Sequence, residues 1–164
     1  MISKARIFIF FLVLTVPSHV SADNPTSVDK GVRTVLRVID GDTLVLSPNE
    51  TVRLIGVDTP ETRHPKKAVQ CFGREASEFT KKMVSGKKVR IEFEEANTFV
   101  SHKDRYGRTL GYVFLEDGTL LNAEIIRHGY GHAYTRFPFR YLEEFRGLER
   151  QARETSLGLW SACN

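Results

Sequence analysis

The chain has 164 residues and a formal net charge of +4, a length that suits one domain with a sizeable core. The basic excess is mild, so the charge alone favours an ordinary soluble surface and excludes a strongly basic, polyanion-coating protein. The charges are nevertheless unevenly spread, with lysine pairs at 66–67, 81–82 and 87–88 and acidic residues concentrated between 40 and 61. A positive rim around a negative centre would suit a polyanion that meets a bound cation.

The first 22 residues predict a secretory signal peptide. Basic residues precede an apolar run over residues 7–16, and a stretch of small residues that ends at Ala22 follows it. This order is typical of such peptides. A run of this length gives about 15 Å of helix, half of a ~30 Å hydrocarbon core, and no second membrane segment is predicted after it. We therefore expect a secreted or periplasmic chain with no stable membrane association after cleavage near Ala22, a flexible segment over 23–31 and a domain over 32–164.

Short runs of β-branched and apolar residues, separated by turn signals, predict the strands of a small sheet. The first three runs are divided by turns at Asp40-Gly41 and Pro48-Asn49 and therefore predict a meander. The expected strands are Thr34–Ile39, Thr43–Leu46, Val52–Val57, Val89–Phe93 and Thr109–Leu115.

Three segments carry apolar residues at helical spacing. They are expected as helices over Glu75–Val84, Leu120–His128 and Arg140–Glu154. Gly86 and Gly129 follow the first two segments, as glycines do at helix C-termini. Five strands and three helices in a chain of this length predict an α+β fold built on a small five-stranded antiparallel barrel with three α-helices.

Three aspartates lie at turns beside the predicted strands. Asp40 and Asp42 flank a glycine, and Asp58 stands where a strand gives way to a Thr-Pro turn. Carboxylate oxygens with no histidine or thiolate beside them favour calcium or magnesium over zinc. Aspartate and glycine are also favoured in turns for backbone reasons alone, and such a pair on its own is more often a turn that binds nothing.

Two arginines stand out from their apolar surroundings. Arg53 lies inside an apolar strand, where a desolvated guanidinium needs a partner, either a carboxylate of the protein or a phosphate. Arg108 opens a later strand, and two guanidinium forks aimed at one place would suit phosphoryl chemistry. Arg53 and Asp58 are five residues apart and would face opposite ways in a regular strand, so bringing them together requires a bend, for which Gly56 is the natural place.

The chain contains two cysteines, Cys71 and Cys163. In an exported chain an even number of cysteines favours a disulfide, and a loop of this size would add up to about 4.6 kcal/mol in the chain-entropy model. Two unpaired thiols are equally consistent with the sequence, because spacing alone does not show that the two residues meet.

Five motifs in order resemble the staphylococcal (micrococcal) nuclease family. They are VIDGDT, RLIGVDTPET, HPKK, REASEFTKKMV and DRYGR, within a similarity that runs from about Thr34 to Trp160. The resemblance implies an OB-type barrel with three helices and a monomeric enzyme with one Ca²⁺ ion. It also implies hydrolysis of DNA and RNA to 3′-phosphate products, and stacking tyrosines with backbone-gripping lysines would favour single strands.

The resemblance also implies roles for individual residues. It places a calcium site at Asp42, Asp58 and the backbone carbonyl of Thr59, with Asp40 close by. It places a general base at Glu61 and a phosphate-binding pair at Arg53 and Arg108. It places substrate contacts at Lys66, Lys67, Tyr106 and Tyr134.

The chain departs from the family pattern at several points. Arg136 stands where the family often has a second aromatic beside Tyr134, the loop over 94–103 is longer, and neither cysteine belongs to the catalytic pattern. The alternative function is a non-catalytic OB module that binds nucleic acid, and a third is a secreted protein with a structural calcium ion. Loss of the acids or arginines would mark the non-catalytic module, and the sequence retains all of them.

Overall fold

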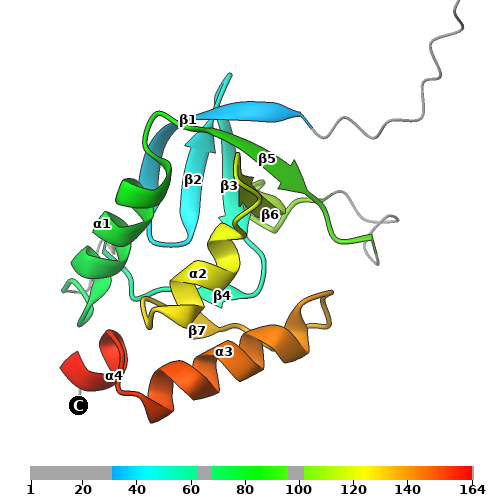
Figure 1. Cartoon of the computed structure of the whole chain (residues 1–164). Helices are drawn as coiled ribbons and strands as arrows, with labels where there is room; N and C mark the ends of the chain where they lie inside the picture. Colours follow the sequence, from blue (N-terminus) through cyan, green and yellow to red (C-terminus); the bar gives the residue numbers. More distant parts are fainter. Residues whose placement is uncertain (1–30, 63–67, 96–101, 164) are drawn as a thin grey trace, which may run out of the picture.

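The computed structural model describes residues 31–62, 68–95 and 102–163, so the expected signal peptide and nearly all of the expected flexible segment lie outside it. Five strands form a closed barrel in the order β1-β2-β3-β6-β5, and β4 and β7 form a separate two-stranded sheet (Figure 1). The strands are β1 (Val32–Asp40), β2 (Thr43–Leu46), β3 (Glu50–Leu54), β4 (Val57–Asp58), β5 (Lys88–Glu92), β6 (Thr109–Leu115) and β7 (His132–Ala133). The predicted α+β barrel is confirmed.

The strand directions correct one detail of the prediction, because the barrel is not wholly antiparallel. β3 and β6 pair in parallel, with Val52 opposite Thr109 and Arg53 opposite Leu110, while the other four pairings of the barrel are antiparallel. The chain leaves β3, passes through the first helix and β5, and returns alongside β3 in the same direction. This parallel pair closes the barrel.

A bend at Gly56 divides the expected strand Val52–Val57 into two. β3 ends at Leu54, and Gly56 adopts a φ of 73°, a conformation that favours glycine. A Cβ atom on Gly56 would lie 2.6 Å from the Phe139 ring and 2.8 Å from that of Phe145. After the bend β4 leaves the barrel and pairs with β7, as Asp58 does with His132.

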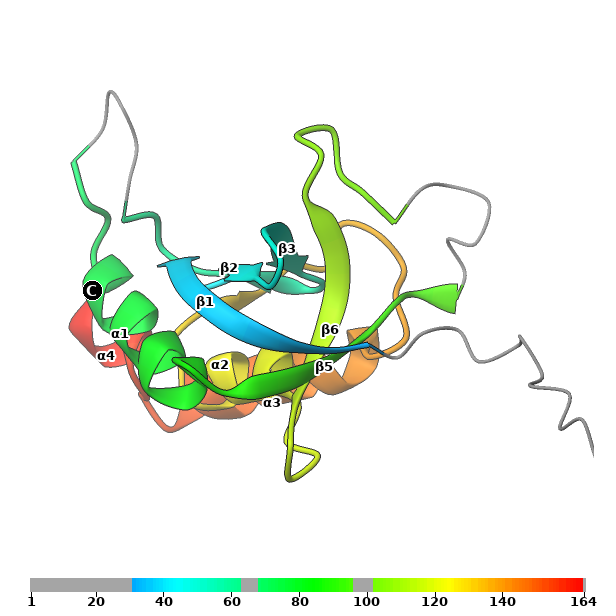
Figure 2. The ribbon, with the colours of Figure 1, turned by 90° about the horizontal axis from the view of Figure 1, so that it is seen from above.

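The three predicted helices are present, with shifts of one or two residues at their ends, and a short fourth helix follows them. The helices are α1 (Gly73–Val84), α2 (Leu121–Arg127), α3 (Leu142–Glu154) and α4 (Leu159–Ala162). Seen from above, they lie on one side of the barrel, while the segment that leads into β6 projects from the other (Figure 2).

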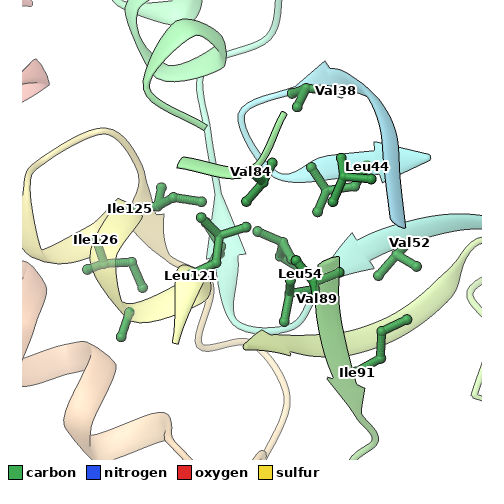
Figure 3. Packing of buried hydrophobic residues seen from close by; sticks show 14 of the residues in the cluster. Val38, Leu44, Val52, Leu54, Val84, Val89, Ile91, Leu121, Ile125 and Ile126 are labelled. Carbon is green, nitrogen blue, oxygen red and sulfur yellow. The ribbon is translucent and has the colours of Figure 1, made fainter. Parts of the chain in front are cut away.

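The hydrophobic core fills the barrel and continues beneath the helices. Figure 3 shows Leu44, Leu54 and Val89 of the strands packed with Leu121 and Ile125 of α2. Each of these five side chains is at most 1% exposed, so the barrel and α2 share one core. Fully burying a side chain of this kind contributes about 1.5–3 kcal/mol.

The C-terminal helix is tied to the segment that precedes α1. Cys71 and Cys163 form a disulfide across 92 residues of sequence, and both views place α4 beside α1 (Figures 1 and 2). Among the described residues, no helix is long and apolar enough to cross a membrane.

Candidate active site

Asp42 stands directly before β2 with a buried side chain. Its Oδ1 accepts a hydrogen bond from the Thr43 hydroxyl at 2.9 Å, and its Oδ2 accepts the Thr59 backbone N–H at 2.9 Å and the Thr59 hydroxyl at 3.1 Å. A carboxylate that has lost its water requires such donors. These bonds hold Asp42 against the chain that leaves β4.

Arg53 connects Asp42 to Asp58 through a side chain that is only 15% exposed. Its Nη1 donates to the backbone carbonyls of Leu54 at 3.1 Å and Val57 at 2.6 Å. Its Nη2 lies 3.1 Å from Asp42 Oδ2 and 3.2 Å from Asp58 Oδ1. The bend at Gly56 thus brings together residues that a straight strand would hold on opposite faces, as the sequence predicts.

Asp58 is the accessible member of this group, with 55% of its side chain exposed. Partial burial raises the pKa of Asp58, Arg53 lowers it, and the nearby negative charge of Asp42 raises it again, so that the net direction is upward. The raised pKa means that the ionised carboxyl is less favourable here than in water. A cation between the two aspartates would relieve that cost.

The chemistry of the donors fits calcium, although the described side chains alone do not complete a cage. Among them, no group of three or more histidine, cysteine, aspartate or glutamate residues is arranged to hold a metal ion. Asp40 accepts a hydrogen bond from the Thr62 hydroxyl, which ties it to the segment beyond Thr59. Two carboxylates, backbone carbonyls and water are the oxygen ligands that calcium takes in proteins.

Gln70 forms hydrogen bonds with both backbone groups of Glu61, its N–H and its carbonyl. The Glu61 N–H donates to Gln70 Oε1 at 2.7 Å, and the Glu61 carbonyl accepts the Gln70 N–H at 3.0 Å. Gly73 packs so closely that a Cβ atom there would lie 3.0 Å from the Glu61 carbonyl oxygen. These contacts fix the chain that carries Glu61 at the entrance to α1.

Arg108 is held by Asp104 at the base of the projecting segment. Asp104 Oδ2 accepts the Arg108 Nε–H at 2.7 Å, and Oδ1 accepts the backbone N–H groups of Arg108 and Tyr106 at 3.0 and 2.9 Å. Burial acts to raise the pKa of Asp104, but the hydrogen bonds outweigh it and lower the pKa. In the parallel pairing of β3 with β6, Leu110 is the partner of Arg53. Arg108 precedes Leu110 by two residues and therefore lies just before this pairing.

The two tyrosines singled out in the sequence lie in different settings. Tyr106 is 69% exposed, and the Arg105 and Arg108 guanidinium carbons lie 5.0 and 5.4 Å from its ring centroid. Tyr134 is half-buried, and its backbone N–H donates to the Gly56 carbonyl at 2.9 Å. Tyr134 therefore borders the bend, whereas Tyr106 belongs to the segment before β6.

The structure brings four of the predicted residues together at one end of β3, while Arg108 and Tyr106 lie with Asp104 in the segment before β6. Asp42, Arg53, Asp58 and Thr59 contact one another, while Lys66 and Lys67 lie outside the described residues. Sequence reasoning overlooked the supporting residues Asp104 and Gln70. The sequence does indicate Asp104, because it is an acid four residues before Arg108. It gives no indication of Gln70, which acts through hydrogen bonds to the backbone of Glu61.

Arg136 also lies near this end of the molecule. Its guanidinium carbon is 5.9 Å from the Tyr134 ring centroid, and its charge contributes to lowering the pKa of Asp58 against the larger effect of burial. Phe137, which the sequence did not single out, is 68% exposed and 6.3 Å from Tyr134 between ring centroids. The aromatic surface beside the bend thus contains a phenylalanine and a cation.

The structure combines a small OB-type barrel with paired aspartates, a bridging guanidinium, a second arginine just before the adjacent strand β6 and an exposed tyrosine, a set of groups whose guanidinium forks suit phosphate. The profile of the family described as staphylococcal nuclease homologue matches residues 51–162. The chain belongs to this family.

Individual relatives agree with this assignment. The chain is 40% identical to a thermonuclease of Staphylococcus hyicus, over 77% of this chain and 74% of the relative. It is 37% identical to a thermonuclease of Staphylococcus intermedius, over 91% and 90%. It is also 37% identical to the endonuclease YncB of Bacillus subtilis, over 78% of this chain and 61% of that protein. These relatives support a nuclease.

Proposed function

We propose that the chain is a calcium-dependent nuclease that hydrolyses phosphodiester bonds of DNA and RNA and leaves 3′-phosphates. The observation that carries the proposal is the Asp42–Arg53–Asp58 group, in which one guanidinium nitrogen lies within 3.2 Å of both carboxylates. A purely structural ion pair would not require a second carboxylate with a raised pKa that is open to solvent. The group combines oxygen donors for a cation with a donor for phosphate.

Asp42, Asp58 and the Thr59 backbone carbonyl would hold the calcium ion, and Asp40 would add negative charge nearby. When bound, calcium supplies positive charge that stabilises the negative charge on the scissile phosphate. The hydrogen bonds from Thr43 and Thr59 orient Asp42, so this ligand is held in place before the ion arrives. Calcium binding would also offset the repulsion between Asp42 and Asp58.

Glu61 would act as the general base. A water oxygen attacks phosphorus in line, its proton passes to the Glu61 carboxylate, and the bond from phosphorus to the 5′ oxygen breaks. The phosphate stays on the 3′ oxygen, and the 5′ oxygen takes a proton from solvent. Such proton transfer contributes roughly 10²–10⁴-fold, and the clamp by Gln70 would keep Glu61 in position for it.

Arg53 and Arg108 would bind the oxygens of the phosphate as negative charge builds on them, an electrostatic effect that is often the largest in such reactions. Asp104 holds Arg108 through its Nε, an arrangement that leaves the outer edge of the guanidinium for a phosphate. Tyr106 and Tyr134 would border the bases, and Lys66 and Lys67 would bind the backbone. Stacking and backbone contacts read no sequence, so single strands would be preferred.

The secreted or periplasmic location is supported by two observations. The first is the signal-like order of residues 1–22, and the second is the disulfide between Cys71 and Cys163, since such bonds persist in oxidising compartments. A monomer is the expected form.

Digestion of single-stranded DNA, in calcium and in chelator, tests the enzyme against the alternative of a non-catalytic OB module. The wild type should cleave only with calcium, and Glu61→Ala should lower kcat by roughly 10²–10⁴-fold, the value of general-base help, with a much smaller change in KM. Glu75→Ala, which removes an exposed carboxylate from α1, is the matched control. Binding in calcium without cleavage by the wild type would instead establish the alternative.

A further inference from the structure

A cavity of about 550 Å³ lies beside the projecting segment, away from the paired aspartates. Its walls come from the start of β1, the turn between β2 and β3 with the start of β3, and the segment before β6. The lining residues are Arg33, Pro48, Asn49, Glu50, Thr51, Lys103, Tyr106, Gly107 and Arg108. Its volume falls within the roughly 300–1,000 Å³ of small-ligand sites.

The walls of this cavity combine cations with an aromatic face. Arg33, Lys103 and Arg108 bring positive charge, and the ring of Tyr106 is 69% exposed. The acidic wall residue, Glu50, accepts a hydrogen bond from the Thr109 hydroxyl at 2.7 Å. The lining residues thus include three cations and one carboxylate, with Arg108 also paired to Asp104 behind the wall, a combination that suits a phosphate together with a planar base.

The cavity shares one residue with the proposed catalytic site and has another on the same strand as Arg53. Arg108 lines the cavity and is also a member of the proposed phosphate-binding pair. Thr51 lies two residues before Arg53 on β3, where Val52 and Leu54 point into the core and Thr51 and Arg53 are half-buried. At about 3.3 Å per residue, the two outward residues are about 7 Å apart along the strand.

From this arrangement we infer that the cavity is a second nucleotide subsite. It takes one nucleotide of the substrate strand, next to those at the catalytic site, with the base on Tyr106 and the backbone phosphate between Arg33 and Lys103. The inference rests on the proposed function, because it extends the path of the same strand. Its consequence is that longer single strands bind more tightly than strands that reach only the catalytic site.

The test compares binding of a trinucleotide and an octanucleotide of deoxythymidylate, each labelled with a fluorophore and measured by anisotropy in chelator. The wild type should bind the octanucleotide more tightly, and Arg33→Ala/Lys103→Ala should narrow the ratio of the two affinities about tenfold. The slope of log K against log salt for the octanucleotide should fall by about 0.7, since the double variant loses the contact with one backbone phosphate. The single variant Lys103→Ala changes an exposed side chain and should show a smaller fall in slope than the double variant.

The control is Lys82→Ala/Arg150→Ala, which removes two exposed cations from α1 and α3, on the opposite side of the barrel from the projecting segment (Figure 2). It loses the same net charge but should keep the affinity ratio of the wild type. Equal affinity of the wild type for both lengths, or an unchanged ratio in both cavity variants, would overturn the inference. Cleavage of the octanucleotide by the wild type in calcium reports separately on the proposed function, because the binding ratio is measured without turnover.

Discussion

At the scale of single residues, Asp58 is the member of the candidate site whose environment disfavours its ionised form. Burial, with a contribution from Asp42, raises the pKa of Asp58 in spite of the guanidinium of Arg53. A carboxyl whose pKa is raised by folding favours the folded state only while it is protonated. That contribution is present below its unfolded pKa and is lost as the pH rises through the folded value. At neutral pH the ionised Asp58 therefore destabilises the calcium-free protein.

Asp58→Asn should consequently stabilise the calcium-free protein at neutral pH and remove most of the stabilisation by calcium. The gain should stay below about 1 kcal/mol, because the side chain is more than half exposed and water screens its charge. Urea unfolding in chelator and in calcium, at pH 7 and at pH 4, measures both effects, and the gain should shrink at the lower pH. A variant less stable than the wild type in chelator at pH 7 would contradict the argument.

At the scale of secondary-structure elements, the sequence predicts the elements whose apolar residues recur at a regular spacing. It does not predict strands or pairings that depend on residues far away in the chain. The apolar period of the α3 segment predicts that helix, since a long amphipathic stripe has few alternatives. β4 and β7 have two residues each, too few for a period to be recognised. The parallel pairing of β3 with β6 depends on the path of the chain through α1 and β5, which no local pattern encodes.

The candidate site shows the same division. Charged residues that interrupt apolar strands, such as Arg53, are visible in the sequence because burial of a charge needs an explanation. Gln70 acts through the backbone of Glu61, and one glutamine in a polar loop resembles any other. Even the contact between Arg53 and Asp58 could be predicted only through the glycine between them.

The contact between Arg53 and Asp58 requires the bend at Gly56, and Gly56→Ala should therefore lower the stability of the fold. The bend would hold the alanine at a positive φ, at about 1 kcal/mol, and the added methyl group would crowd the rings of Phe139 and Phe145, at about 1–3 kcal/mol more. Guanidinium unfolding should therefore show a loss of about 2–4 kcal/mol. Gly86→Ala shares the positive φ, at 69°, but its Cβ would meet nothing within 4 Å, so it should lose only about 1 kcal/mol. Equal losses in the two variants would show that packing at the bend contributes nothing.

At the scale of the whole molecule, the disulfide connects the C-terminus to the chain that carries the proposed base. Cys71 lies inside a turn in which the Gly73 N–H donates to the Gln70 carbonyl at 3.0 Å. The same Gln70 clamps Glu61 from both sides. α4, the last helix of the chain, is therefore covalently attached to the turn that positions Glu61, although α4 contributes no residue to the proposed chemistry.

Cys71→Ser/Cys163→Ser should therefore lower stability through the unfolded state more than through the native contacts. The bond closes a loop across 92 residues of sequence, so its loss should cost about 4 kcal/mol, at the upper end of the typical range for disulfides. The unfolded chain becomes less compact without the bond, so the denaturant slope should rise as the midpoint falls. Guanidinium unfolding of the wild type with and without reductant provides the matched comparison, and the reduced wild type should behave like the variant. A lower midpoint with an unchanged slope would instead locate the effect in the native state, in the turn that holds Glu61.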